Sequence, residues 1–470
     1  MSNRRKDKRK FSLPSLVKPW RISLTEPLKR KNGEISPLLL VFGFAALIIV
    51  GTVLLILPIS SRSGHFTAPV DALFTATSAV CVTGLLVQDT GTYWSLFGQA
   101  VILILIQIGG LGFMTSATLF LIALGRRIGL REKLLIVETM GIMKLGGLVS
   151  LIRKMALFAL IVEGMGTAIF YVYFSANSPT GMPLWESLFH AVSAFNNAGF
   201  DIFGDYQSLI HYQNNAPFLL TTAGLIIIGG ISFVVVADIF GRRRFINLAL
   251  DSKIVLSTTA CLLLGGTLII LFTEFSNVNT LGTMPLPQKL LIAFFQSTTA
   301  RTAGFSAINM GEITHYCLFF IIILMFIGGA SGSTAGGIKV NTFGILVATL
   351  VSALRGKEYA GAFNKEFVPQ QIYRALAVVI LSLGIITTVV FLLTITERYD
   401  FLDIFFETVS AFANVGLSSG ITPDLSVAGR LIISATVFIG RLGPLTLALL
   451  LIERQQTSIY RYPQENVRIG

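Results

Sequence analysis

The sequence predicts an all-α membrane protein in which eight transmembrane helices form four helix, pore-loop, helix repeats around a central pseudo-fourfold pore. Two observations lead to this fold class, namely eight long apolar stretches and a fourfold motif in the loops between them. The 470-residue chain is 53% hydrophobic and only 13% charged, with a mean hydropathy of +0.75. A soluble protein would struggle to bury so much apolar surface, so the composition favours an integral membrane protein.

Each apolar stretch is long enough to cross a hydrocarbon core of about 30 Å, which takes about 20 helical residues. The stretches lie near residues 36–58, 94–124, 155–174, 216–240, 254–273, 316–350, 375–396 and 429–452. The first is too long for a cleavable signal peptide, and its flank lacks a small-residue cleavage pattern. We therefore expect the mature chain to keep its basic head.

Basic residues gather at one end of each pair of stretches. Residues 4–31 hold eleven Lys and Arg, and the excess recurs at residues 126–133, 242–244 and 355–365. The opposite loops are poor in Lys and Arg. The positive-inside rule then places both termini and the three linkers in the cytoplasm, in a cell membrane. The net charge of +12 is a topology signal spread over loops, so it does not indicate nucleic-acid binding.

This pairing divides the chain into nine segments. They are a basic cytoplasmic N-terminus (1–35), repeat 1 (36–124), a cytoplasmic linker (125–154), repeat 2 (155–240), a linker (241–253), repeat 3 with a broken last helix (254–350), a linker (351–374), repeat 4 (375–452) and a cytoplasmic tail (453–470).

The outer loop of each repeat carries the same motif, a hydroxyl residue six positions before a glycine and a bulky apolar residue directly after it. The four sets are Ser78, Gly84 and Leu85; Ser193, Gly199 and Phe200; Thr298, Gly304 and Phe305; and Ser410, Gly416 and Leu417. A phenylalanine stands ten residues before each glycine, and an acid thirteen before three of them. An acid there suits the first turn of a short helix, where a carboxylate meets the positive end of the helix dipole.

The next apolar stretch of each repeat carries an Ile-Gly-Gly block, which reads Ile-Gly-Arg in the fourth. Its first glycine follows the loop glycine by 25, 30, 24 and 24 residues. Ordered blocks in four places are poorly explained by coincidence, so we infer an internal fourfold repeat.

A short helix that enters the membrane and returns as a loop suits a cation pore. Its carbonyl end carries partial negative charge, and glycine lets backbone carbonyls replace the water around an ion. The predicted lining is Val82, Thr83, Gly84, Asn197, Ala198, Gly199, Thr302, Ala303, Gly304, Asn414, Val415 and Gly416. The competing interpretation is four ordinary glycine turns in outer loops.

The motifs VTGL, NNAGF, RTAGF and NVGL, followed by GGASGSTAGGIK and FIGRLGP, resemble the Trk/Ktr/HKT superfamily of potassium transporters, most closely its Ktr-type transmembrane subunits. The resemblance runs from about residue 36 to the tail. Trk-type relatives carry an additional N-terminal helix pair, whereas here the first span already belongs to repeat 1. The resemblance implies transport of K⁺, with Na⁺ coupling left open, and no organic cofactor in this chain.

The sixth stretch contains a run of small and polar residues that sustains a helix poorly. The run includes Gly328, Gly329, Ser331, Gly332, Ser333, Thr334, Gly336, Gly337 and Lys339. The resemblance implies that this break forms an intramembrane loop below the filter and acts as a gate. The alternative is tight helix packing through small residues.

Arg441 replaces the second glycine of the fourth Ile-Gly-Gly block and lies within an apolar span. A charge there is costly, so it should face the bundle interior or the pore, either to repel cations or to pair with an acid such as Glu407. Arg301 presents the same choice, with a structural role favoured. Glu163 should neutralise an interior arginine or lie near a helix end. His190 is expected to be a packed side chain, because no second His or Cys lies at metal spacing.

An enzyme is a weak competitor, for example a protease using Ser331 or Ser333 with Lys339, since it leaves the repeats unexplained. A coupled secondary transporter is a third class, although such proteins often carry inverted repeats and these four share one orientation. No P-loop, nucleotide fingerprint or metal motif appears, and Cys81, Cys261 and Cys317 are scattered. The resemblance implies a homodimer in membrane lipid that rests on a cytosolic ring of nucleotide-binding regulatory subunits, docked through the basic loops and the tail.

Overall fold

The computed structural model describes residues 38–112, 115–116, 118–119, 122, 147–176 and 178–443. The expected N-terminal segment 1–35, most of the linker 125–154 and the tail 453–470 lie outside these residues. The regular secondary structure of the described part is helical except for two isolated β-bridges and one hairpin, in which β1 (Gly361–Ala362) pairs antiparallel with β2 (Lys365–Glu366). The all-α prediction therefore needs this small correction, which falls in the predicted linker 351–374.

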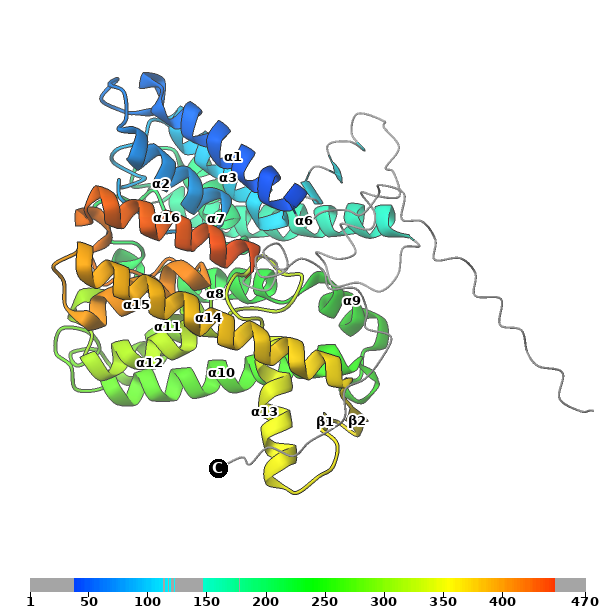
Figure 1. Ribbon diagram of the computed structural model, residues 1–470. Coiled ribbons are helices and arrows are strands. Elements are labelled where there is room, and N and C mark those ends of the chain that lie inside the picture. The colour runs from blue at the N-terminus through cyan, green and yellow to red at the C-terminus, as the bar shows by residue number, and fades with distance from the viewer. Residues whose placement is uncertain are drawn as a thin grey trace, which may run out of the picture. The chain divides into compact units, whose positions relative to one another are not determined.

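Four sets of helices follow one another along the chain (Figure 1). The first set is α1 (Leu38–Ile56), α2 (Pro69–Val80) and α3 (Leu96–Leu111). The second is α6 (Leu148–Phe174), α7 (Pro183–Phe195), α8 (Ala216–Gly230) and α9 (Phe233–Arg242). The third is α10 (Leu250–Glu274), α11 (Leu286–Thr299), α12 (His315–Phe326) and α13 (Val340–Leu354). The fourth is α14 (Pro369–Thr396), α15 (Phe401–Ala413) and α16 (Val427–Leu442).

Three helices of the described residues, α6, α10 and α14, are long and apolar enough to cross a membrane alone. The helices α8 and α9 pass that test only as a pair, and they are bent by 94°. The predicted span 216–240 is therefore not straight. Its helix ends at Gly229 and Gly230, and the Ser232 side chain accepts a hydrogen bond from the Val234 amide to begin α9. The predicted span 316–350 is interrupted at residues 327–339, as the run of small residues suggested.

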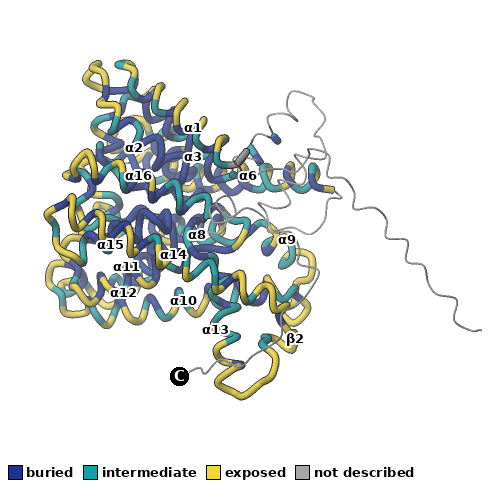
Figure 2. Tube along the Cα trace, viewed as in Figure 1, coloured by how far each residue is buried: buried dark blue, intermediate teal, exposed yellow. Residues whose placement is uncertain are grey.

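The short helices α2, α7, α11 and α15 occupy the centre of the described core. Figure 2 shows dark, buried backbone there and exposed positions along the outer helices α10 and α14. Three of the short helices begin with proline in their first two positions, where the missing amide hydrogen costs nothing. The acids Asp71, Glu186 and Asp403 lie in the first turns of α2, α7 and α15, which confirms that prediction.

The first glycine of the Ile-Gly-Gly or Ile-Gly-Arg block explains how α3, α8 and α16 pack closely against the short helices. A Cβ built on Gly109 would lie 2.0 Å from the Val80 carbonyl oxygen. The equivalent distances are 1.8 Å from Gly229 to the oxygen of Phe195 and 1.9 Å from Gly440 to that of Phe412. These oxygens stand at or next to the last residue of a short helix. Glycine is needed because any side chain would strike backbone there.

We expect Gly229→Ala to lower the melting temperature of the detergent-solubilised protein, because its methyl group would overlap the Phe195 oxygen. Overpacking of this kind costs about 1–3 kcal/mol. Thermal unfolding followed by fluorescence would measure it. Gly224→Ala is the matched control, since Gly224 lies in the same helix with nothing within 4 Å of its added Cβ. Equal melting temperatures for the two variants would contradict this account.

Candidate functional site

The four loop glycines lie against one another in a closed ring. Each added Cβ would strike a carbonyl oxygen of the next loop, the distances being 2.5 Å from Gly84 to Ala198, 2.8 Å from Gly199 to Ala303, 2.5 Å from Gly304 to Val415 and 2.0 Å from Gly416 to Thr83. The fourth loop thus meets the first, where the Asn414 side-chain amide also donates to the Thr83 hydroxyl at 3.0 Å. All twelve predicted lining residues belong to these four adjoining loops.

Each loop has two residues in the left-handed backbone region, the glycine and the residue two positions before it. The φ angles of Val82, Asn197, Thr302 and Asn414 are 57°, 58°, 71° and 52°. Asparagine tolerates this region, but valine and threonine are β-branched and rarely adopt it. Such strain persists where surrounding structure imposes it, and it gathers at functional sites. Sequence reasoning missed this feature, although asparagine at two of the four places was an available signal.

The hydroxyl six residues before the glycine closes three of the loops. The amides of Gly84 and Gly416 donate to the hydroxyl oxygens of Ser78 and Ser410, each at 3.1 Å. In the second loop the Ser193 hydroxyl donates to the Phe200 carbonyl at 2.6 Å. These hydrogen bonds are the physical reason for the spacing.

The third loop departs from this pattern. The Thr298 hydroxyl donates back to the Phe294 carbonyl within α11 at 2.8 Å. The loop closes through Thr299 instead, whose carbonyl accepts from the amides of Ala303 at 2.9 Å and Gly304 at 3.4 Å. Phe295 is fully buried, whereas Phe294, which stands ten residues before the glycine, is only partly buried. The third short helix ends at Thr299, five residues before its glycine, whereas α2, α7 and α15 end four, four and three residues before theirs.

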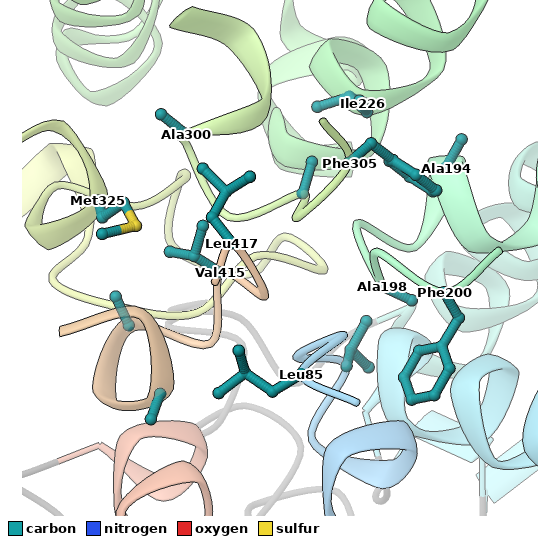
Figure 3. Packing of buried hydrophobic residues seen from close by; sticks show 14 of the residues in the cluster. Leu85, Ala194, Ala198, Phe200, Ile226, Ala300, Phe305, Met325, Val415 and Leu417 are labelled. Carbon is teal, nitrogen blue, oxygen red and sulfur yellow. The ribbon is translucent and has the colours of Figure 1, made fainter. Parts of the chain in front are cut away.

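The bulky residue after each glycine anchors the loop in the protein. Figure 3 shows Leu85, Phe200, Phe305 and Leu417 on four separate loops, and each is at most 1% exposed. Because successive residues of an extended strand face opposite sides, burying this side chain helps to fix the orientation of the glycine beside it.

All four glycines line a cavity of about 260 Å³ on one side of the ring. Asp201 also lines it, and this carboxylate accepts a hydrogen bond from the Phe203 amide at 3.2 Å. Burial raises the pKa of Asp201 to about 7, and the charge of nearby Asp89 adds to the shift. Asp89 itself is held by the amides of Thr92 at 2.7 Å and Tyr206 at 2.9 Å.

A second cavity of about 350 Å³ is lined by the segment between α12 and α13 and by the ends of α3, α8 and α16. Its lining includes Gly110, Gly229, Thr334, Lys339 and Arg441. Two cationic side chains thus line one cavity, whereas the glycine cavity holds the carboxylate of Asp201.

Residues 327–339, which hold all nine predicted gate residues, form an irregular loop held by backbone contacts. The Ala330 amide donates to the Gly230 carbonyl and the Thr334 hydroxyl to the Gly229 carbonyl, both at 3.0 Å. A Cβ built on Gly336 would lie 2.6 Å from the Ala413 oxygen, at the end of α15. The small residues therefore allow close backbone contact on several sides, more than one helix–helix face would need.

Both interior arginines bind carbonyl oxygens of this loop. Arg441 donates from Nη1 to Thr334 at 2.7 Å and from Nη2 to the Gly109 carbonyl of α3. Arg301 donates from Nη2 to Gly328 at 3.3 Å. The suggested pair of Arg441 with Glu407 is wrong, because Glu407 accepts hydrogen bonds from the hydroxyls of Thr422 and Ser418 instead.

Two other predictions have clear outcomes. Glu163 is buried in the middle of α6 and accepts hydrogen bonds from the amide groups of Asn196 at 3.0 Å and Gln107 at 3.3 Å. It therefore does not lie at a helix end, and it forms no ion pair with an arginine among the residues that the structure describes. His190 is packed as expected, stacked on Phe218 with Nε2 3.0 Å from the Thr222 hydroxyl.

The protease alternative lacks its dyad. The Ser333 hydroxyl donates to the Ala330 carbonyl at 2.7 Å, and the Lys339 ammonium donates to the Ala335 carbonyl. Neither Ser331 nor Ser333 is hydrogen-bonded to Lys339 in the described residues, where no group of three or more potential metal ligands occurs either.

Long apolar helices surrounding buried short helices define a helical integral membrane protein. Comparison with known proteins gives the family: TrkH, described as a cation transport protein, matches residues 39–462. The chain belongs to this family, whose members are transporters and not enzymes.

Individual relatives cover nearly the whole chain. The Ktr system potassium uptake protein B of Bacillus subtilis (strain 168) is 43% identical over 92% of this chain and 96% of that protein. The potassium/sodium uptake protein NtpJ of Enterococcus hirae is 39% identical over 94% and 99%. Among solved structures, the potassium transporter TrkH from Vibrio parahaemolyticus is similar with a TM-score of 0.71 and 19% identity, covering 91% of this chain and 86% of that one. At this identity the match shows the fold.

Proposed function

We propose that this chain is the ion-conducting transmembrane subunit of a potassium uptake system. The observation that carries the proposal is the closed ring of four glycine loops, whose four glycines all line one cavity. The relatives named as potassium uptake proteins support it. The direct test is rubidium uptake by a transport-deficient bacterium that expresses the chain. Uptake no greater than that of cells with an empty vector, despite protein in the membrane, would refute it.

The twelve loop residues listed above are proposed to form the filter through their backbone oxygens. The short helices α2, α7, α11 and α15 end at these loops, so the negative ends of their dipoles favour a cation there. A left-handed residue at every second position of each loop cancels the usual alternation of carbonyl directions along an extended strand, which suits carbonyls that face one axis. In the ring, backbone carbonyl oxygens then replace the water molecules that hydrate the ion.

The proposed architecture is eight crossings in four repeats around a pseudo-fourfold pore, with both termini in the cytoplasm and the segment boundaries predicted above. The cyclic contact of the loops in chain order supports the fourfold arrangement. The structure begins α6, α10 and α14 several residues before the predicted starts of repeats 2, 3 and 4. These helices therefore extend into the proposed cytoplasmic linkers.

The loop of residues 327–339 is proposed to be the gate. It lines the second cavity and carries Lys339, and Arg441 lies beside it. Loop and charges together would obstruct a cation that leaves the ring toward the cytoplasm. Sodium-coupled transport of K⁺ or Na⁺ is the second candidate, favoured by the Enterococcus relative named for both ions. Rubidium uptake that stops without external sodium would favour coupling.

The proposed partners are a second copy of the chain and a cytosolic ring of nucleotide-binding regulatory subunits. The naming of two relatives as parts of a Ktr system supports further subunits. We expect a chain that ends at residue 452 to lose dimerisation and ring binding in size-exclusion chromatography. Intact assembly of the truncated chain would remove the tail from the docking face.

External pH should modulate uptake through Asp201. Below its pKa of about 7 this carboxyl is neutral, and above it the charge attracts cations to the glycine cavity. We expect the apparent rubidium KM to rise severalfold as external pH falls from 8 to 6, in line with about 1 kcal/mol for unit charges in water at 4 Å. Asp201→Asn should show the high KM at both pH values. A variant that keeps the full pH dependence would exclude this residue.

A further inference from the structure

A groove of about 360 Å³ lies between α10, α13 and the β1–β2 hairpin, apart from both cavities beside the glycine ring. Its walls are mostly apolar, with Ile254, Leu262, Phe343 and Val347 among them. One end is different in character, because the basic residues Arg355 and Lys357 lie there. The groove is thus long and apolar with a cationic end.

The geometry of two crossing helices creates this groove. A Cβ built on Gly344 would lie 2.4 Å from Cγ2 of Ile254, so α13 and α10 touch there. Figure 1 shows α13 running steeply across α10, and helices that cross at one point diverge beyond it. The hairpin closes the far end, where the amides of Lys357 and Gly361 donate to the backbone and side-chain oxygens of Ser352 at 3.0 and 3.4 Å.

The two basic side chains have no competing acid. Arg355 and Lys357 are exposed, and in the described residues neither is within salt-bridge distance of a carboxylate, although Glu358 and Glu366 lie nearby in sequence. Their charge is therefore available to an anion at the membrane surface. An anionic phospholipid complements both parts of the site, the acyl chain in the apolar groove and the phosphate at the basic end.

We propose that this groove binds one anionic phospholipid of the cytoplasmic leaflet. The choice of leaflet rests on the proposed orientation of the chain, whereas the binding itself does not. The helix α13 begins directly after the loop of residues 327–339. A lipid wedged between α10 and α13 restrains that helix, so it also restrains the loop.

The test is native mass spectrometry of the full chain with equal amounts of palmitoyl-oleoyl phosphatidylglycerol and phosphatidylcholine. We expect the first retained lipid to be phosphatidylglycerol by about 30-fold, equal to about 1 kcal/mol for each basic side chain. Arg355→Gln with Lys357→Gln should reduce the ratio to near one. Lys365→Gln is the control, because Lys365 lies in the same linker but does not line the groove. An unselective wild type, or a double variant with full preference, would overturn the proposal.

A second variant tests where the acyl chain lies. Ala348 lines the groove, and Ala348→Phe fills it without touching the basic end. We expect that variant to lose the tightly retained lipid of either headgroup, and retention would place the lipid elsewhere. Cys261 also lines the groove and is exposed, whereas Cys81 and Cys317 are buried. Oxidative cross-linking of two copies through Cys261 would show that a second chain fills the groove, which also refutes the proposal.

Discussion

Gly304→Ser should lose most of the preference for potassium over sodium. The added Cβ would lie 2.5 Å from the Val415 oxygen, and the backbone at this position has φ +83°. Because the four loops touch in a closed ring, a displacement of one loop moves the carbonyls of its neighbours. We expect at least a tenfold fall in the ratio of rubidium to sodium uptake, equal to about 1.4 kcal/mol, which is comparable to the cost of one left-handed non-glycine residue.

Gly420→Ser is the matched control for this experiment. Gly420 has φ +107° in the loop that follows Gly416, and nothing lies within 4 Å of its added Cβ. The control variant therefore carries the free-energy cost of a non-glycine residue at positive φ, but its side chain does not collide with the ring. Full selectivity in Gly304→Ser would remove the filter assignment, and equal losses in both variants would attribute the effect to general strain.

Arg441→Gln should increase ungated uptake by the chain alone. The substitution removes a positive charge from the second cavity, which the loop of residues 327–339 lines, and weakens the contacts to the carbonyls of Thr334 and Gly109. Two unit charges 4 Å apart repel by about 4 kcal/mol at an effective dielectric constant of 20, so a part of this repulsion suffices for a tenfold effect. Rubidium flux into proteoliposomes without any partner protein would measure it.

In the same assay, Arg441→Lys separates the effect of the positive charge from that of the two hydrogen bonds to the Thr334 and Gly109 carbonyls. Lysine keeps the charge but lacks the planar fork that reaches two carbonyl oxygens at once. Low rubidium flux in the lysine variant would show that the positive charge limits conduction. High flux would show that the hydrogen bonds of Arg441 to the two carbonyls limit it. Unchanged or lower flux in a folded Arg441→Gln protein would exclude both roles.

Much of the arrangement was predictable because it depends on local residue chemistry. The loop glycines, the hydroxyls that close three loops and the first-turn acids follow patterns whose physical reasons act within about thirteen residues. The break between α12 and α13 was visible for the same reason, since a run of small residues disfavours helix.

Contacts distant in sequence were not predictable in the same way. The partners of Arg441 lie 107 and 332 residues away, and nothing in the sequence marks the carbonyls of Thr334 and Gly109 as its acceptors. Backbone acceptors carry no residue signature, whereas Glu407 was an obvious acid and proved to be occupied by hydroxyls. The bend after α8 was missed because its apolar sequence continues through the break.

The third repeat has its own loop closure, lacks a first-turn acid and has a longer break in its last helix than the second repeat. In a tetramer of identical subunits, a loop such as residues 327–339 would occur in every subunit. Four copies of the loop would then compete for the same space around the axis. Because the four repeats are joined in one chain, each has its own sequence. A change in one repeat therefore need not occur in the other three, whose packing is kept. If the loop of residues 327–339 is the gate, as proposed, control of the pore lies in one repeat alone and is asymmetric.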